Sequence, residues 1–185
     1  MTGYAFTGSY CTFGDSFSQL CALIDSGEDI IPIMSENAYS ADTRFFTAAD
    51  FIRSVEEKTG KKVVHTIAEA EKFGQKRLDK LIISPCTGNT LAKIANGITD
   101  TAVTMAAKAH LRCDGKLLIA LASNDAMSQN LKNLAALLTR KSVYFLPMRQ
   151  DSPMGKPHSL VADFTTLKRA LSEMDNGKQI RPIFI

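Results

Sequence analysis

The stretch Leu81-Ile-Ile-Ser-Pro-Cys-Thr-Gly-Asn-Thr-Leu91 decides the fold class of this 185-residue chain. It begins with an apolar run at residues 81–83, passes through small polar residues and a glycine, and enters a helical pattern at residues 91–98. A continuous apolar run bounded in this way is typical of a strand covered on both faces, as in a parallel sheet. The small polar residues are therefore predicted to form a loop at the carboxyl end of a buried strand.

Apolar runs and helical patterns alternate on both sides of this stretch. Strands are predicted at residues 3–7, 30–34, 81–83, 117–122 and 143–146, with a short further strand at Val63-Val64. Helices are predicted at residues 15–26, 91–98, 102–111, 131–138 and 167–174, between Thr47 and Gly60, and after the capping box Thr66-Ile-Ala-Glu69. This alternation favours an α/β fold of three layers with a doubly wound parallel sheet. Residues 1–185 are expected to form a single domain, since no linker or internal repeat is visible.

Composition excludes several classes of protein. The chain is 45% hydrophobic and 22% charged, as is ordinary for a soluble globular protein. Its net charge of +3 comes from scattered basic residues, so no nucleic-acid partner is expected. No apolar run reaches the length of a membrane span, and residues 1–6 lack the pattern of a secretory signal. We therefore expect a cytoplasmic protein without membrane association, in which the four cysteines are reduced.

Three loops at predicted strand ends carry the candidate ligand-binding residues. Ligands of an open parallel sheet bind outside the carboxyl ends of its strands. Residues 7–12, Thr-Gly-Ser-Tyr-Cys-Thr, offer glycine and hydroxyl groups ahead of a helix, which suits either a phosphate group or an ordinary turn. Residues 84–90 let a flat ligand approach the backbone, or simply cap the next helix. Residues 123–127, Ser-Asn-Asp-Ala-Met, present the same two alternatives. Together the loops predict a crevice for a phosphorylated, flat-ringed ligand.

Arg44 is the most attractive basic residue of the sequence. It lies in a polar loop after the second predicted strand, and a planar guanidinium is suited to binding a carboxylate. The alternative is an ordinary surface charge beside a helix. Lys93, Lys108 and Arg149 are weaker candidates of the same kind.

Cysteine and histidine give no clear catalytic set. Cys86 lies near a predicted helix N-terminus, a setting that lowers the pKa of a thiol, although a packing role is the stronger interpretation. His65, His110 and His158 are too far apart in sequence to indicate a shared metal site, so no metal is expected. No catalytic residue is identified.

Residues 84–100, Ser-Pro-Cys-Thr-Gly-Asn-Thr-Leu-Ala-Lys-Ile-Ala-Asn-Gly-Ile-Thr-Asp, resemble the flavin-binding signature of the cysteine-decarboxylase flavoprotein family. Thr7-Gly8-Ser9 is similar to the first phosphate loop of that family, and Ser35 matches its phosphate-binding hydroxyl after the second strand. Over its full length the chain resembles the family of B subunits of bacterial dipicolinate synthases. The matching stretches include Thr7-Gly-Ser-Tyr-Cys-Thr12, Asn124-Asp-Ala126, Gln150-Asp-Ser-Pro153 and Arg181-Pro-Ile-Phe-Ile185.

The resemblance implies a flavodoxin-like Rossmann domain that takes part in oxidising dihydrodipicolinate to dipicolinate, in the mother cell of a sporulating bacterium. It implies FMN on this chain, a homo-oligomer, and the A subunit of dipicolinate synthase as the partner that carries NAD(P), the hydride acceptor. Arg44 then becomes the candidate anchor for a small dicarboxylate substrate. The implied cofactor-binding residues are Gly8, Ser9, Tyr10, Ser35, Pro85, Thr87, Gly88, Asn89, Thr90, Ser123, Asn124, Asp125 and Ala126.

Departures from the decarboxylases leave other functions open. Residues 67–71, Ile-Ala-Glu-Ala-Glu, stand where those enzymes carry a histidine, and Ser123-Asn-Asp125 replaces their Ala-Met-Asn motif. The long irregular segment from Arg149 to His158 contains no cysteine and is predicted to be a binding loop or an interface arm. One alternative is therefore a non-catalytic partner that stabilises the dehydrogenase of the complex. Another is a free-standing FMN-dependent enzyme, decarboxylase-like, with a different substrate.

Overall fold

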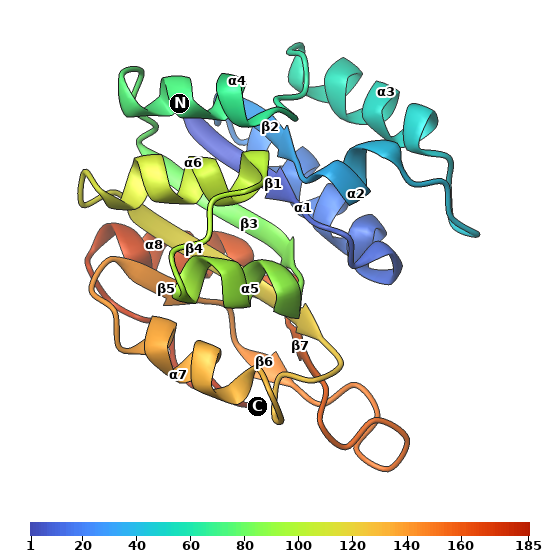
Figure 1. Cartoon of the computed structure of the whole chain (residues 1–185), viewed down its shortest axis with the longest axis vertical. Helices are drawn as coiled ribbons and strands as arrows, with labels where there is room; N and C mark the ends of the chain where they lie inside the picture. The colour runs from blue at the N-terminus through green and yellow to red at the C-terminus, as the bar shows by residue number, and fades with distance from the viewer.

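A computed structural model describes all residues, 1–185, with helices on both faces of a central sheet (Figure 1). The strands are β1 (Thr2–Phe6), β2 (Ile30–Met34), β3 (Lys80–Cys86), β4 (Lys116–Ser123), β5 (Val143–Phe145), β6 (Met148–Arg149) and β7 (Leu160–Ala162). The α-helices are α1 (Phe13–Asp25), α2 (Glu36–Ser40), α3 (Ala48–Thr59), α4 (Ile67–Glu71), α5 (Gly88–Ala95), α6 (Ala102–Leu111), α7 (Leu131–Leu138) and α8 (Leu167–Asp175). Short 3-10 helices are η1 (Tyr10–Thr12), η2 (Lys72–Gly74) and η3 (Phe164–Thr166). None of the helices combines the length and the apolar character needed to cross a membrane.

The sheet is mixed, with a parallel body and an antiparallel edge. Its strand order is β2-β1-β3-β4-β7-β6, and β2, β1, β3, β4 and β5 run parallel. β7 runs antiparallel to both β4 and β6. The doubly wound α/β fold is therefore confirmed, while a wholly parallel sheet is wrong at this edge. β4 changes its partner along its length, since Leu117–Ile119 pair with β5 and Ala122–Ser123 pair with β7.

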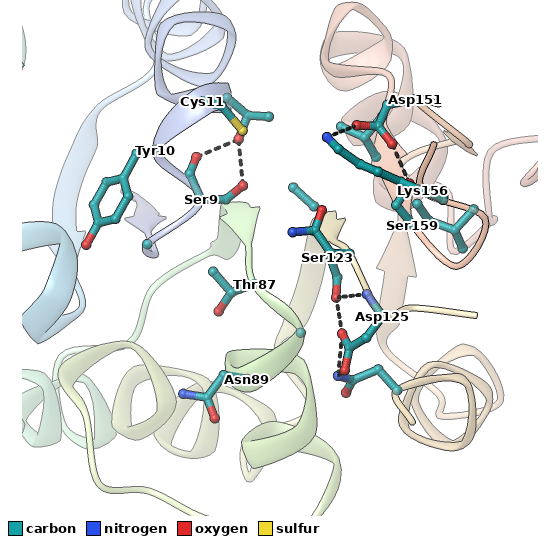
Figure 2. A pocket seen from close by; sticks show the side chains of 18 of the residues that line it. Ser9, Tyr10, Cys11, Thr87, Asn89, Ser123, Asp125, Asp151, Lys156 and Ser159 are labelled. Carbon is teal, nitrogen blue, oxygen red and sulfur yellow. Dashed lines mark hydrogen bonds and ion pairs between the residues drawn. The ribbon is translucent and has the colours of Figure 1, made fainter. Parts of the chain in front are cut away.

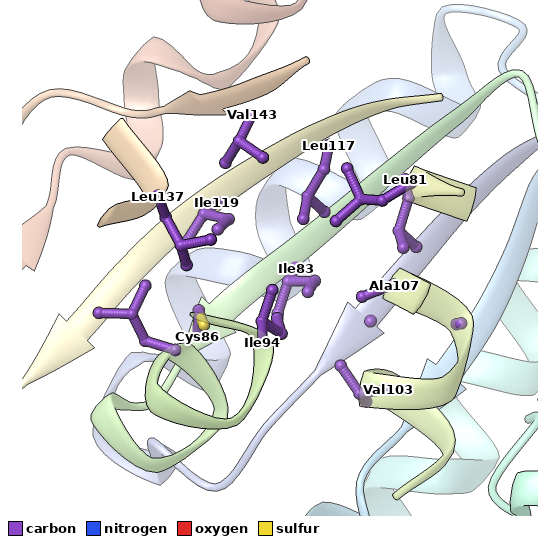
Figure 3. Close-up of a cluster of buried hydrophobic side chains, with 14 of the residues drawn as sticks. Leu81, Ile83, Cys86, Ile94, Val103, Ala107, Leu117, Ile119, Leu137 and Val143 are labelled. Atoms are coloured by element: carbon purple, nitrogen blue, oxygen red, sulfur yellow. The ribbon is translucent and has the colours of Figure 1, made fainter. Parts of the chain in front are cut away.

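Two hydrophobic clusters, one on each face of the sheet, hold the three layers together. Side chains alternate along β4, so that Leu117 and Ile119 join one cluster and Leu118 joins the other. The first cluster (Figure 3) packs against α4, α5, α6 and α7, and the second against α1, α3 and α8. Each fully buried leucine or isoleucine stabilises the fold by about 1.5–3 kcal/mol. Burial on both faces explains why the central strands are continuous apolar runs.

Several local expectations differ from the structure. Val63-Val64 is not a strand, because only a single bridge forms, between Ile33 and Val64. The helix expected from Leu91 begins at Gly88, since Thr87 caps it. Neither the short helix α2 nor the antiparallel strands β6 and β7 were expected. The pairing of β7 with the end of β4 brings residues 151–161 to the ligand edge of the sheet.

The topology fixes where ligand-binding loops can meet. β1 lies between β2 and β3, so the chain leaves β1 and β3 toward opposite sides of the sheet. Loops that leave neighbouring strands in opposite directions open a crevice at their carboxyl ends. In this chain, these are the loops at residues 7–12 and 84–90.

Candidate functional site

A crevice of about 700 Å³ lies at the carboxyl ends of β1, β3 and β4 (Figure 2). It receives side chains from all three predicted loops and from the loop that contains Arg44. Nine of the thirteen expected cofactor-binding residues line it: Gly8, Ser9, Tyr10, Thr87, Gly88, Asn89, Ser123, Asn124 and Asp125. Its volume falls in the range of roughly 300–1,000 Å³ found for ligand pockets.

The remaining four expected residues do not line the crevice. Ser35 caps α2, where its Oγ accepts a hydrogen bond of 3.3 Å from the N–H of Ala38. Pro85 and Ala126 are buried beneath the loops that contain them, and Thr90 is buried in the first turn of α5. None of the four lines the crevice, so a direct role in cofactor binding stays a prediction.

Thr7 ties the first loop to the second. Its Oγ1 donates a hydrogen bond of 2.9 Å to the carbonyl of Pro85 and accepts one of 2.9 Å from the N–H of Thr87. The N–H of Thr7 also donates to the Pro85 carbonyl, at 3.2 Å. Since Thr7 is almost fully buried, it does not contact a ligand but sets the distance between the two loops that do.

The N-terminus of α5 forms the floor of the crevice. Thr87 Oγ1 accepts a hydrogen bond of 3.2 Å from the N–H of Thr90, so Thr87 is the helix cap and also lines the crevice. Asn89, in the first turn, is exposed. A helix N-terminus carries partial positive charge and unpaired N–H groups, so this floor suits a polar or anionic group.

The third loop rests directly on the start of α5. Asp125 Oδ1 accepts a hydrogen bond of 2.6 Å from Ser123 Oγ, and Asn130 Nδ2 lies 3.0 and 2.8 Å from the two carboxylate oxygens. A Cβ on Gly88 would lie 2.7 Å from Asn130 Nδ2, 2.8 Å from Asp125 Oδ1, and closer still to Ser123 Oγ. Glycine is therefore required at position 88 for the two loops to meet. Asn130, which lies outside the expected set, lines the crevice.

The segment from Asp151 to Val161 forms a further wall. The Asp151 carboxylate accepts hydrogen bonds from Ser159 Oγ and, at 2.9 Å, from Lys156 Nζ. These bonds, that of Ser159 most strongly, hold the pKa of Asp151 below its usual range, and Asp151 raises the pKa of Lys156. Lys156 and Asp151 were not expected in the site, because nothing in the sequence indicates the antiparallel pairing of β7. The only sequence signal was the length of the irregular segment.

Arg44 is the one candidate cation from the sequence that lines the crevice. Its guanidinium carbon lies 4.8 Å from the centre of the Phe45 ring, and both side chains are exposed. Lys93 instead forms an ion pair of 2.8 Å with Asp100. Lys108 and Arg149 lie outside the crevice wall.

For Cys86 the stronger interpretation, a packing role, is confirmed, and the alternative of a lowered thiol pKa is wrong. The thiol is fully buried in the hydrophobic cluster of Figure 3, and burial raises its pKa. The packing interpretation therefore describes Cys86. Cys11, in contrast, is exposed and lies at the crevice wall.

The histidines lie in separate surroundings. His65 stacks on Tyr39 with ring centres 3.8 Å apart. His110 Nε2 lies 3.0 Å from the carbonyl oxygen of Lys116, and burial lowers its pKa. His158 is exposed in the loop between β6 and β7. None of the three lines the crevice.

Comparisons with known proteins place these features in context. The Flavoprotein family model matches residues 3–169. The B subunit of dipicolinate synthase from Bacillus subtilis (strain 168) is 36% identical over 184 residues, which cover 99% of this chain and 92% of the relative. The crystal structure of the corresponding B subunit from Bacillus halodurans matches with a TM-score of 0.91 and 34% identity, covering 100% of this chain and 95% of that one. An FMN-dependent cysteine decarboxylase, SpaF, shares the fold with a TM-score of 0.69 and 20% identity, covering 94% and 96% of the two chains.

Proposed function

This chain belongs to the Flavoprotein family, within the group of dipicolinate synthase B subunits, and on that premise we propose that it binds FMN and serves as the flavin subunit of a dipicolinate synthase. The observation that carries the proposal is the meeting of three small-residue loops in one crevice of about 700 Å³ at the switch point of the sheet. The proposed reaction is the oxidation of dihydrodipicolinate to dipicolinate. The A subunit of that synthase is the proposed partner, and NAD(P) the proposed hydride acceptor on it.

The residues of the crevice fit FMN by their chemistry. Gly8 and Ser9 precede the N-terminus of α1, where N–H and hydroxyl groups suit a phosphate. Asn89 and Asn124 supply amide donors and acceptors, which suit the polar edge of a flavin ring. When bound, FMN would supply a carrier that takes two electrons from the substrate and passes them to NAD(P), the final acceptor.

The cations of the crevice fit a dicarboxylate substrate. Arg44 and Lys156 come from separate loops and both line the crevice. Charge-assisted hydrogen bonds from such groups to carboxylates are shorter and stronger than neutral ones. In the proposed reaction these two side chains bind and orient the substrate, and the surrounding walls limit its contact with water.

A test of the proposal starts with the absorbance spectrum of the purified protein, recorded after addition of FMN and desalting. Flavin bands that survive desalting are expected for the wild type. Gly8→Val should weaken FMN retention, because the added side chain would enter the phosphate loop near Tyr10 and Asn37. Lys93→Ala, outside the crevice, is the matched control and should retain FMN as the wild type does. A wild-type protein that retains no FMN would contradict the proposal.

A second candidate function, that of a non-catalytic partner for the dehydrogenase of the complex, is favoured by one observation. Met154 is 97% exposed in the loop between β6 and β7, which extends away from the body of the molecule (Figure 1). Loops held by a rigid scaffold carry a large share of binding residues, and Met is enriched in protein interfaces, so Met154 is a candidate contact for another protein. Met154→Ser should then weaken co-purification with the A subunit, while FMN retention stays unchanged. Assays of each variant with and without that partner separate both functions from a free-standing enzyme.

A further inference from the structure

A row of three hydrogen-bonded asparagine side chains, Asn96, Asn133 and Asn130, leads to Asp125 in the crevice wall. Asn130 Nδ2 donates to both carboxylate oxygens of Asp125, at 3.0 and 2.8 Å. Asn133 Nδ2 donates to Asn130 Oδ1 at 2.9 Å, and Asn96 Nδ2 donates to Asn133 Oδ1 at 3.1 Å. Asn130 and Asn133 are each only 7% exposed, so their amide groups depend on these partners.

The hydrogen bonds along this row of asparagines all run in one direction, from donor NH2 to acceptor oxygen toward Asp125. The oxygen of Asn130 is engaged by Asn133, so Asn130 presents only its NH2 group to Asp125. Ser123 Oγ also donates to Asp125, at 2.6 Å. Reversing one amide would place two acceptors or two donors face to face in a buried position, which costs free energy. The protein groups around the Asp125 carboxylate are therefore donors, and Asp125 is held as an acceptor.

Asp125 keeps acceptor capacity on its Oδ2 atom. A carboxylate oxygen can accept two hydrogen bonds, and Oδ2 accepts one, from Asn130. Asp125 is half-buried and lies in the crevice wall (Figure 2). A ligand N–H group would satisfy this oxygen, whereas a ligand carbonyl or carboxylate would be repelled. The cations that suit ligand carboxylates, Arg44 and Lys156, come from other loops.

We propose that Asp125 selects ligands that carry a ring N–H group, and that Asn130, Asn133 and Asn96 are positioning residues that keep Asp125 an acceptor. This inference rests on the proposed function, because it takes the crevice as the ligand site. The ring N–H can come from two sources, the imide of a flavin or the protonated or reduced ring nitrogen of a heterocyclic dicarboxylate. The two sources are distinguished by measuring binding with two pairs of ligands.

The first pair is cis-piperidine-2,6-dicarboxylate, which has a protonated ring nitrogen, and cis-cyclohexane-1,3-dicarboxylate, which has a CH2 group in its place. Calorimetric titration of the wild type should give about 10- to 100-fold tighter binding of the nitrogen compound, the range for a hydrogen bond to a charged group. Asp125→Asn should abolish this preference, because Ser123 and Asn130 both donate to Oδ1, so the amide oxygen would take that place and the NH2 group would replace Oδ2, the acceptor offered to the ligand.

The second pair is FMN and its N3-methyl derivative, compared by flavin fluorescence titration. A preference for FMN that disappears in Asp125→Asn assigns the N–H group to the flavin, and a preference within the first pair alone assigns it to the substrate. Equal binding within both pairs by the wild type would overturn the inference. The proposed function fails separately, if the wild type retains no FMN, and the dicarboxylate pair can still be measured on that protein.

The positioning role is tested by the ratio of two affinities, that of the N–H ligand to that of its analogue in the same pair. Asn133→Asp removes the NH2 group that engages Asn130, so Asn130 can turn its oxygen toward Asp125, and the preference for the N–H ligand should fall at least several-fold. If Asn133 had a purely structural role, the variant would bind both ligands of a pair more weakly by the same factor. An unchanged ratio would therefore overturn the assignment. Should that variant fail to fold, Asn96→Ala at the exposed end of the row should lower the ratio by a smaller factor. Asn176→Ala, at the end of α8, is the control and should leave the ratio unchanged.

Discussion

Gly88 sets how closely two loops of the site can approach each other. We expect Gly88→Ala to lower the free energy of unfolding by about 1–3 kcal/mol, as for overpacking in a filled space, because the new Cβ would meet Asp125 Oδ1 at 2.8 Å. Urea denaturation measures this change. Gly14→Ala in α1 is the control, since nothing lies within 4 Å of the added Cβ. It should stabilise the protein by about 0.5–1 kcal/mol, and equal effects of the two changes would contradict the close approach at Gly88.

Cys86 should be unreactive in the folded protein despite its place beside the ligand loop. Burial raises the pKa of its thiol, so the reactive thiolate is disfavoured until the chain unfolds. With a thiol reagent at mildly alkaline pH, mass mapping should find the exposed Cys11 labelled first and Cys86 last. Labelling of Cys86 in urea is the positive control. Rapid labelling of Cys86 under native conditions would revive the reactive-thiol interpretation.

Among the helices, α4 and α6 each begin with a capping box, and only the box of α4 contains a titratable group. In α4, Thr66 and Glu69 cap each other, and hydrogen bonds from Thr66 lower the pKa of Glu69 below its ordinary value of 4.5. Thr66→Ala should cost about 0.5–2 kcal/mol at neutral pH. A carboxyl group whose pKa is lowered by folding stabilises the folded state when the pH is above its ordinary pKa. This stabilisation is lost as the pH falls through the pKa of the group in the folded protein. The cost of Thr66→Ala, from urea midpoints, should therefore shrink below pH 4.5.

Thr101→Ala in α6 provides the control for this pH dependence. Its capping partner is Thr104, which does not titrate. The expected cost is again about 0.5–2 kcal/mol, but it should be the same at acid and neutral pH. A parallel decline in both variants would show that the pH effect does not come from Glu69.

Elements were predictable where the local pattern decides them. The apolar runs at residues 81–83 and 117–122 are buried on both faces, so hydrophobicity alone reveals β3 and β4. β7 has no such signal, because Leu160–Ala162 is short and depends on pairing with a strand distant in sequence. Val63-Val64 shows the reverse error, since two β-branched residues resemble a strand but form a single bridge.

The same limit applies to the site. Loops that follow strongly apolar strands could be predicted, and they supply Thr87 and Asn124 to the crevice. Lys156 could not, because its position depends on the antiparallel β6–β7 pair and on the side-chain bonds of Asp151. Asn130 was missed because its place in the wall follows from the turn between Asp125 and α7. Contacts between segments distant in sequence therefore set the part of the site that sequence patterns do not reveal.

At the scale of the whole molecule, the central sheet should make the two faces unfold together. Leu117→Ala removes packing from one cluster and Leu118→Ala from the other. Each should cost about 2–5 kcal/mol, as for leucine truncation in a core. Both variants should keep one urea transition when followed by circular dichroism and by tyrosine fluorescence. Separate transitions for the two probes would contradict the expectation of a single domain.

The segment between β6 and β7 is held at both ends by strand pairing and is exposed in its middle, at Met154. Arg149 pairs with Val161, while Asp151, Lys156 and Ser159 between them face the ligand crevice. Residues inserted near Met154 would lengthen a loop whose closure is already provided by two strands. Doubling the length of a flexible loop costs only about 0.6 kcal/mol of closure entropy. Insertions at this point can therefore reshape the crevice for bulkier ligands without disturbing the core, which makes the segment the natural place to engineer a new specificity.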